Sequence, residues 1–214
     1  MSVTRLIDIS PVVSAQIAVW PGDRKFTYTT SARIADGDNI DLGAIETTLH
    51  AGAHADAPSH YVGGGASIDQ RDLGLYYGPC EVVEVPVVGG ARLRSADLPG
   101  PVRARRVLFK TGTFPDPNQF NQDFAALSAE LVDALAAAGV RLIGVDTPSV
   151  DLFADKVLEA HQALARNDMA NLEGLVLEDV APGLYTLIAL PLRIAGADAS
   201  PVRAALVSDT SATD

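Results

Sequence analysis

The sequence predicts a single α/β domain with mixed β-sheets and flanking helices. Its 214 residues are enough for one domain with a substantial core and fall short of the length usual for two. Short runs rich in β-branched residues are separated by Pro/Gly turns, and two further segments show helical periodicity instead. Strands mixed with helices are typical of an α/β domain, so we expect residues 1–214 to form one.

Four apolar runs are predicted to be strands. Valine, isoleucine, leucine and phenylalanine dominate them, and turn sequences such as Gly89-Gly90 and Pro99-Gly100-Pro101 lie between them. The predicted strands are residues 81–88, 106–110, 142–145 and 185–190.

Two segments are predicted to be helices. Residues 128–138 begin at a capping serine, Ser128, and end before Gly139, which is the usual punctuation of a helix. One face of this segment is apolar, with Leu131, Leu135 and Ala138. Residues 151–166 also repeat at helical spacing, and this spacing places four side chains on one face: Phe153, Val157, His161 and Leu164.

Composition and charge exclude several classes of partner. A net charge of −11 argues against binding to nucleic acid or to an anionic membrane, because both require clustered Lys and Arg. Cys80 is the only cysteine, so an intrachain disulfide is impossible and a reducing compartment is indicated. The first residues do not resemble a secretion signal, and no apolar run is long enough for a membrane span. We therefore expect a cytoplasmic protein.

The segment LHAGAHADAPSHY, residues 49–61, contains three of the four histidines of the chain. A helix is disfavoured there by Gly52 and Pro58. In a strand, even-numbered residues share a face, so the histidines and Asp56 would lie opposite a row of small residues. The even-numbered set is His50, His54, Asp56 and His60, and the small set is Ala51, Ala53, Ala55, Ala57 and Ser59.

A straight strand would spread these side chains over about 33 Å, which is far too long for metal bonds of roughly 2 Å. The chain must therefore bend, and Gly52 and Pro58 allow it to do so. Convergent histidines and an aspartate, without cysteine, are typical of a catalytic zinc or manganese site. We interpret the segment as a metal-binding ribbon.

The fourth histidine, His161, is ambiguous from its pattern. It lies on the apolar face of the second predicted helix, where it could be a buried structural histidine or a metal ligand. Glu173 follows in the apolar run NLEGLVL, where its carboxylate could be an edge residue or a buried ligand. Periodicity does not decide between these alternatives.

The residues 50–60, HAGAHADAPSH, resemble the signature H-x-G-T-H-x-D-x-P-x-H of the metal-dependent cyclase superfamily. Five further segments resemble the bacterial kynurenine formamidase (arylformamidase) branch of that superfamily, so the resemblance extends over nearly the whole chain. They are VWPGD (19–23), KTGTFPDPNQFN (110–121), GVDTPSVD (144–151), LEGLVLEDV (172–180) and LIALPLRIAGADASPVRA (187–204). One departure is Ala53, where the signature has threonine; it removes a hydroxyl but no ligand.

The resemblance implies a cyclase-like swivelling β/β/α fold and a site with two zinc ions per subunit, with Mn²⁺ as the alternative metal. It assigns His50, His54 and Asp56 to the first ion, and it makes Asp56 a bridge to a second ion held by His161 and Glu173. It also makes His60 the proton donor and acceptor. Trp20 would contact the substrate, although from its sequence context it would otherwise be a structural aromatic beside a Pro-Gly turn. Homodimers or larger homo-oligomers are implied as well.

The implied activity is hydrolysis of N-formyl-L-kynurenine to L-kynurenine and formate, a step of tryptophan degradation. An isatin hydrolase or another metal-dependent hydrolase of cyclic amides or esters is the closest alternative, since it would share every ligand. A metal-binding protein without activity is a third possibility, but we would expect such a protein to lack His60 or Glu173. A serine hydrolase is disfavoured because the chain has no G-x-S-x-G elbow, and Cys80 is interpreted as a buried thiol.

Overall fold

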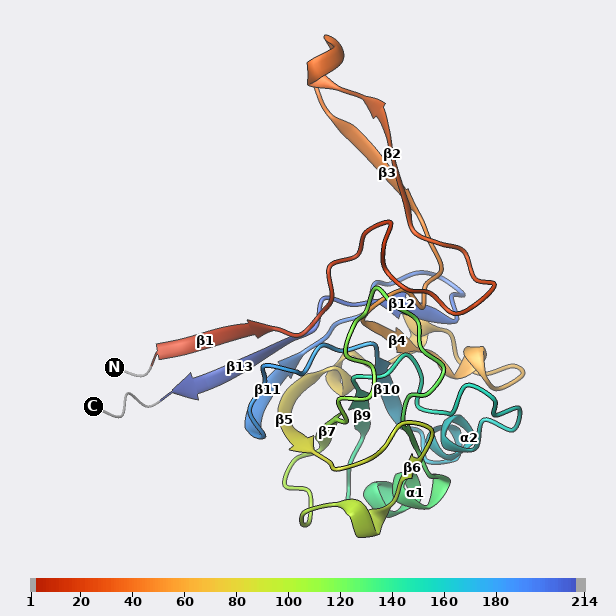
Figure 1. Ribbon diagram of the computed structural model, residues 1–214, viewed down its shortest axis with the longest axis vertical. Helices are drawn as coiled ribbons and strands as arrows, with labels where there is room; N and C mark the ends of the chain where they lie inside the picture. Colours follow the sequence, from red (N-terminus) through yellow and green to blue (C-terminus); the bar gives the residue numbers. More distant parts are fainter. Residues whose placement is uncertain (1–2, 211–214) are drawn as a thin grey trace.

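A curled sheet of nine strands forms the body of the protein in a computed structural model that describes residues 3–210 (Figure 1). Three neighbouring pairs, β5 with β7, β7 with β9 and β9 with β10, are parallel, and the remaining pairs are antiparallel. In sheet order the strands are β1 (Val3–Asp8), β13 (Ala205–Thr210), β11 (Gly183–Ile188), β5 (Tyr77–Glu84), β7 (Arg106–Lys110), β9 (Leu142–Val145), β10 (Ala170–Glu173), β4 (His54–Asp56) and β12 (Ala199–Pro201).

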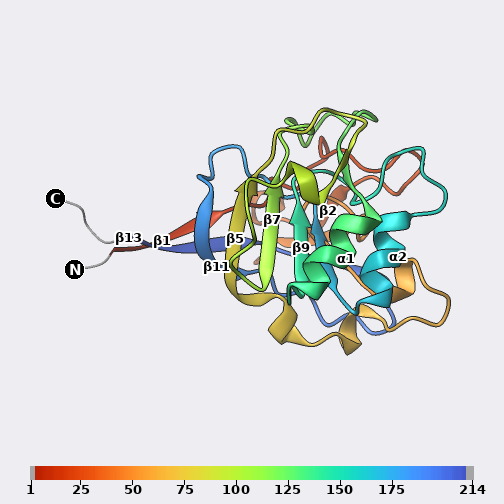
Figure 2. The same cartoon turned by 90° about the horizontal axis from the view of Figure 1, so that it is seen from below.

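The two helices, α1 (Ala129–Ala137) and α2 (Glu159–Arg166), lie side by side on one face of the parallel strands (Figure 2). Leu131 of α1 and Leu164 of α2 belong to the same buried cluster as Val107 and Ile143 of the sheet. The opposite face is covered by a second apolar cluster that includes Leu108 and the alanines of the ribbon of residues 49–61. Strands buried on both faces need continuous apolar sequence, which is why β7 and β9 are apolar without alternation.

The structure confirms most of the predicted elements. The strands predicted at residues 106–110 and 142–145 are β7 and β9 to the residue, and the first helix is confirmed, with the Ser128 hydroxyl accepting the amide of Leu131 at 3.1 Å. The strand predicted at residues 185–190 is present but lies two residues earlier at both ends, as β11 (Gly183–Ile188). The prediction for residues 81–88 was wrong at both ends, because β5 runs from Tyr77 to Glu84 and Pro86 cannot donate a hydrogen bond to a continuing ladder.

The prediction of one helix over residues 151–166 was wrong in its first half, since α2 begins only at Glu159. The carboxylate of Asp151 accepts the backbone amides of Ala160 and His161, each at 3.0 Å, and thereby caps the shorter helix. Residues 152–158 form turns instead. Val157 is therefore exposed rather than part of an apolar stripe.

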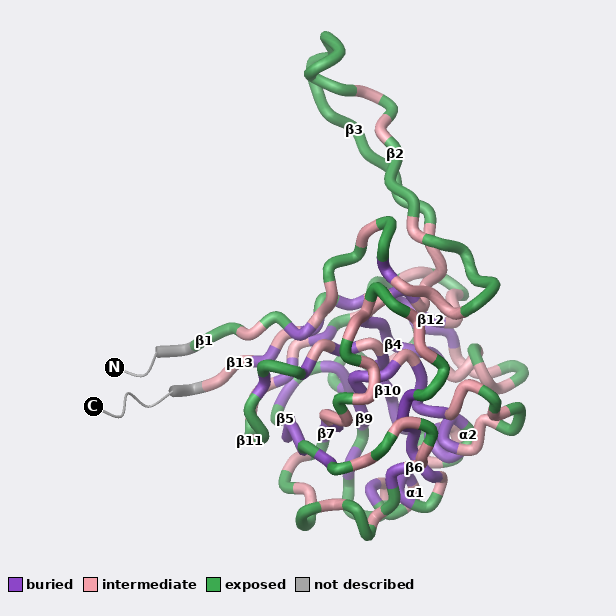
Figure 3. Tube along the Cα trace, viewed as in Figure 1, coloured by how far each residue is buried: buried purple, intermediate pink, exposed green. Residues whose placement is uncertain are grey.

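Two further strand pairs lie outside the main sheet: β2 (Thr27–Ala32) with β3 (Leu42–Glu46), and β6 (Arg92–Leu93) with β8 (Ala126–Leu127). The β2–β3 hairpin projects from the body as an arm and is exposed along most of its length (Figures 1 and 3). Single 3-10 turns complete the structure at Ile34–Asp36, Pro58–His60, Ile68–Gln70, Leu73–Leu75 and Ser95–Asp97. Within residues 3–210, neither helix has the length and hydropathy needed to span a membrane.

Candidate metal centre

The ribbon of residues 49–61 is bent, as the sequence predicts. Only His54–Asp56 form a strand, β4, which lies between β10 and β12; Glu173 pairs with His54, and Ala199 pairs with Asp56. Gly52 adopts a φ of +65°, which turns the chain before the strand, and Pro58–His60 form a 3-10 turn after it. Ala53, Ala55 and Ala57 are buried in the apolar cluster beneath the ribbon, so its small residues pack closely while its polar residues face away.

Five side chains converge in two sets that share Asp56. His50, His54 and Asp56 form one set, and Asp56, His161 and Glu173 form the other; in each set the atoms able to bind a metal lie within 4.8 Å of one another. His50 Nδ1 is 3.0 Å from Asp56 Oδ1, whereas His161 Nε2 is 3.4 Å from Asp56 Oδ2. The two carboxylate oxygens of Asp56 therefore face different sets, as a bridging ligand requires.

The residues of this cluster fit a pair of divalent cations. His54 Nε2 and Asp56 Oδ1 are buried and make no well-aligned hydrogen bond among the described residues, although His50 Nδ1 lies 3.0 Å from Asp56 Oδ1. Buried polar atoms without partners are rare, because each costs free energy, so these two point to a ligand. Nitrogen and oxygen donors without sulfur suit zinc or manganese. His161 and Glu173, whose roles the sequence pattern left open, are both buried here and belong to the cluster.

Interactions between neighbouring histidines and carboxylates shift the pKa values of His50 and Asp56. Burial disfavours the charged form of His50, but hydrogen bonds with Asp56 and Asp198 outweigh that penalty and raise the pKa of His50 to about 9. Burial alone would raise the pKa of Asp56, yet hydrogen bonds from His161 and His50 hold it well below its ordinary value. The carboxylates are thus ionised and ready to bind a cation, while protons compete with a metal for the histidine nitrogens.

Each of the three histidines of the cluster has its second ring nitrogen fixed by an acceptor outside the two sets. His54 Nδ1 donates to the carbonyl oxygen of Gly52 at 2.9 Å, and His161 Nδ1 donates to Asp151 at 2.8 Å. His50 Nε2 lies 3.1 Å from Asp198 Oδ2. Such contacts set the tautomer of a metal-binding histidine and orient its ring, so they leave the inward nitrogen free to coordinate.

Asp151, Asn171 and Asp198 are contacts that the sequence reasoning missed. Asn171 Nδ2 donates to Asp56 Oδ2 at 2.7 Å and to Glu173 Oε1 at 3.1 Å, and so fixes both carboxylates. The two-residue alternation of side chains in a strand could have identified Asn171, because Asn171 lies two residues before Glu173 on β10 and therefore on the same face. No local pattern marks Asp198, whose partner His50 is 148 residues away, or Asp151, which contacts His161 ten residues later.

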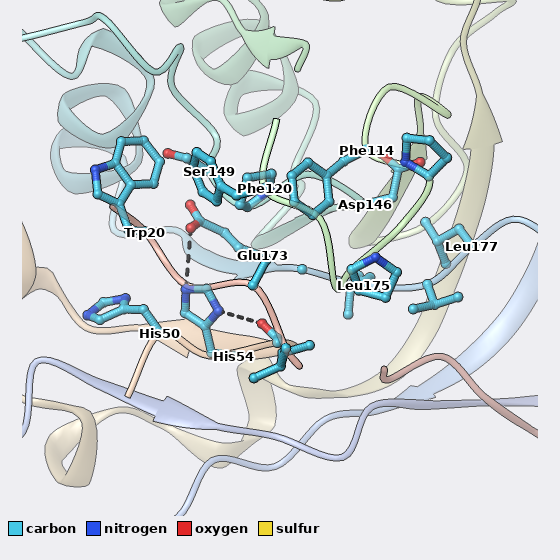
Figure 4. A pocket seen from close by; sticks show the side chains of 18 of the residues that line it. Trp20, His50, His54, Phe114, Phe120, Asp146, Ser149, Glu173, Leu175 and Leu177 are labelled. Carbon is cyan, nitrogen blue, oxygen red and sulfur yellow. Dashed lines mark hydrogen bonds and ion pairs between the residues drawn. The ribbon is translucent and has the colours of Figure 1, made fainter. Parts of the chain in front are cut away.

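A cavity of about 380 Å³ opens above the cluster (Figure 4). Its walls are largely aromatic and aliphatic. The histidines and Glu173 of the cluster line it together with His60, and further charged residues also line it, among them Lys110, Asp146 and Glu178. Trp20 also lines this cavity, with its ring centroid 5.0 Å from that of Phe153 and 5.5 Å from that of Phe120. His60 is exposed and also lines this cavity, and its ring centroid is 4.3 Å from that of His50. An aromatic ligand would therefore reach the cluster and His60 together.

Cys80 takes no part in this site. It is fully buried in β5, and burial raises the pKa of its thiol to about 12. The interpretation of Cys80 as a buried structural thiol is confirmed by its position, and a thiol with so high a pKa is a poor nucleophile at neutral pH.

Close backbone packing at Gly174 holds Glu173 against the ribbon, and it gives a testable prediction. Gly174 has a φ of +66°, and a Cβ atom there would lie 2.3 Å from the carbonyl oxygen of Gly52. We expect Gly174→Ala to lower the free energy of unfolding by roughly 2–4 kcal/mol, since it combines left-handed strain with a backbone overlap. Urea denaturation would measure the change. Gly100→Ala is the matched control, because a Cβ atom there meets nothing within 4 Å, and a loss equal to that of the control would contradict the prediction.

Comparison with known proteins gives consistent matches. The sequence profile of the Cyclase family matches residues 7–152. The kynurenine formamidase of Sphingopyxis alaskensis is 45% identical over 205 residues, which cover 95% of this chain and 98% of that protein. A structure described as a predicted metal-dependent hydrolase from Bacillus stearothermophilus superposes with a TM-score of 0.81 at 26% identity, covering 96% of this chain and 98% of that one. Isatin hydrolase A from Labrenzia aggregata superposes with a TM-score of 0.83 over 97% of this chain and 94% of that one, but at 20% identity it shows the fold alone.

Proposed function

The chain belongs to the Cyclase family and, within it, to the kynurenine formamidases, a group of metal-dependent hydrolases; from this premise we propose that it hydrolyses N-formyl-L-kynurenine to L-kynurenine and formate with two zinc ions per subunit. The observation that supports this most strongly is the pair of ligand sets sharing Asp56 at the end of an aromatic cavity. His50, His54 and Asp56 would hold one ion, and Asp56, His161 and Glu173 would hold the other. Manganese suits the same donors.

Zinc at these positions would supply Lewis acidity toward the formyl oxygen and would lower the pKa of water enough for attack near neutral pH. His60 takes a proton from the attacking water and returns it to the aryl nitrogen as the carbon–nitrogen bond breaks. Its place on the cavity wall beside His50 suits this exchange. Such proton transfer typically accelerates a reaction by about 10² to 10⁴.

The aromatic side of the cavity suits the aniline ring of the substrate. Trp20, Phe114 and Phe120 line this side, and Leu175 and Leu177 extend it (Figure 4). Stacking on Trp20 would contribute roughly 0.5–1.5 kcal/mol beyond the burial of apolar area. An isatin-type cyclic amide would also present an aromatic ring, so the choice between the two substrates depends on direct measurement.

The decisive experiment follows the loss of formylkynurenine absorbance with untagged protein. We expect turnover that a chelator abolishes and added zinc restores, with two zinc ions per chain by elemental analysis. Isatin should be hydrolysed much more slowly than formylkynurenine. Turnover unaffected by the chelator would overturn the metal-dependent mechanism, and faster turnover of isatin would replace the proposed substrate.

We further propose that the protein is a cytoplasmic homodimer in which the β2–β3 arm packs against a second copy. A hairpin of two strands is at best marginally stable alone in water. In this arm Tyr28 and Ile45 are a cross-strand pair, and both are more than half exposed, at 62% and 66%. Apolar side chains paired on one face of a projecting hairpin indicate a surface that a partner covers. The single cysteine, which leaves no intrachain disulfide possible, supports the cytoplasm.

Charge introduced on the arm should disrupt the dimer. We expect light scattering to give twice the chain mass of 22.4 kDa for the natural protein. For the double variant Tyr28→Ser with Ile45→Asp we expect the mass of one chain, because an uncompensated carboxylate would be buried in the interface. Val88→Ser is the control, since Val88 is 73% exposed on the body rather than on the arm. A dimer that persists in the double variant would contradict this interface.

A further inference from the structure

Asp198 lies outside the two ligand sets that share Asp56, although with His50 and His60 it forms a third group whose possible ligand atoms lie within 4.8 Å of one another. It immediately precedes β12, which pairs with β4. The backbone carbonyl of Asp198 accepts the amide of Ala57 at 2.8 Å, so the sheet itself fixes Asp198 at the point where the ribbon leaves β4. The 3-10 turn that positions His60 begins at the next residue, Pro58.

One oxygen of this carboxylate contacts two histidines with different roles. Asp198 Oδ2 is 3.1 Å from Nε2 of His50 and 3.4 Å from Nδ1 of His60. The two imidazole rings are correspondingly close, with centroids 4.3 Å apart and planes inclined by 39°. A shared acceptor explains why two rings approach so closely, since each can direct an N–H group at the same oxygen.

We propose that Asp198 is a positioning residue that orients His50 and His60 together. The inference rests on the proposed function, because it assigns His50 to a metal and His60 to proton transfer. An N–H group of His50 directed at Asp198 leaves its Nδ1 free beside Asp56 for the cation. An N–H group of His60 directed at Asp198 leaves its Nε2 free to accept the proton of the attacking water.

This arrangement couples metal binding to proton transfer through a single side chain. A carboxylate that orients a metal-binding histidine is typically worth a factor of 10 to 100 in metal affinity or activity. Orientation of a proton-transferring histidine by an aspartate also fixes its tautomer, and a wrong tautomer strongly lowers turnover. Asp198 has both kinds of partner, so its loss should affect zinc binding and kcat at once.

The test compares Asp198→Ala and Asp198→Asn with the natural protein. We expect zinc affinity, measured by competition with a chromophoric chelator, to fall by about 10- to 100-fold, and kcat to fall at least as much. KM should change less than kcat, because Asp198 contacts no substrate in this mechanism. Nitrogen-15 NMR of the zinc-loaded protein, which has only four histidines, should show the Nδ1–H tautomer of His60 in the natural protein and its loss in both variants. Asp198→Glu should recover part of the activity.

Asp69→Asn is the matched control. The carboxylate of Asp69 accepts the backbone amide of Gly196, two residues before Asp198, but contacts no histidine. The Asp69→Asn variant therefore tests whether any disturbance of this segment is enough to lower zinc affinity and to change the tautomer of His60. Unchanged zinc affinity and an unchanged His60 tautomer in Asp198→Ala would overturn the proposal, as would equal losses in the control. If the natural protein fails to hydrolyse formylkynurenine, the zinc and NMR measurements still test Asp198, so the two failures are distinguishable.

Discussion

Replacing Asp56 with alanine is expected to remove both ions of the proposed zinc pair and all formamidase activity above background. The two oxygens of Asp56 face different ligand sets, at 3.0 Å from His50 Nδ1 and 3.4 Å from His161 Nε2. Without this carboxylate, Glu173 would be the only acidic residue left in the two ligand sets to offset the charge of two divalent cations in a buried site. Both ions should therefore be lost together rather than one at a time.

Elemental analysis after gel filtration in zinc-free buffer would measure the loss. Asp146→Asn is the control, because Asp146 is a buried carboxylate at the same cavity whose oxygens accept hydrogen bonds from Thr111 and Gly112 rather than from histidines. We expect two zinc ions per chain in that control and fewer than about 0.2 in Asp56→Ala. Retention of one ion per chain in Asp56→Ala would show that Asp56 does not bridge.

His60→Ala should lower kcat by about 10² to 10⁴ and leave the zinc content unchanged. The reason is that His60 lies on the cavity wall outside the two sets that share Asp56, so its removal deletes a proton carrier without deleting one of their ligands. Steady-state kinetics together with zinc analysis would separate these effects.

Ser59→Ala is a suitable control for this second prediction. Ser59 belongs to the same 3-10 turn, and its buried hydroxyl has no hydrogen-bond partner among the residues that the structure describes. Its removal should leave kcat near that of the natural protein. If His60→Ala retains full turnover, proton transfer must depend on another group.

Local sequence was sufficient to predict a strand or a helix wherever one sequence signal dominated. Strands β7 and β9 are apolar runs bounded by turns, and α1 has a serine cap and a terminal glycine, so each was predicted within a residue or two. The predicted second helix was too long because periodicity continued upstream of Glu159, whereas the side chain of Asp151 accepts the first helical amides and fixes the start of the helix there. A side chain that competes for backbone hydrogen bonds is invisible to a periodicity argument.

In the candidate site, too, local sequence patterns predicted some residues correctly and could not place others. Strand alternation correctly put His54 and Asp56 on one face and the alanines on the other. It could not bring His161 or Glu173 to the same point, because these residues follow more than 100 positions later and only the sheet order places them there. Only the family resemblance assigned His161 and Glu173 to the same site as His54 and Asp56. Asp151 and Asp198 lie in the segments 144–151 and 187–204 that resemble the family, but neither strand alternation nor the resemblance gave them a role, because they act by orienting other residues.

The buried alanine face of β4 has a consequence for the energetics of metal exchange. Ala53, Ala55 and Ala57 anchor the ribbon in the apolar core, and hydrogen bonds to Gly52, Asp151 and Asn171 already fix the ligands. Metal binding therefore does not have to drive folding, in contrast to zinc fingers, which unfold without their ion. We expect cobalt to replace zinc in the native protein without refolding, so that the geometry of each ion could be followed by its visible absorption.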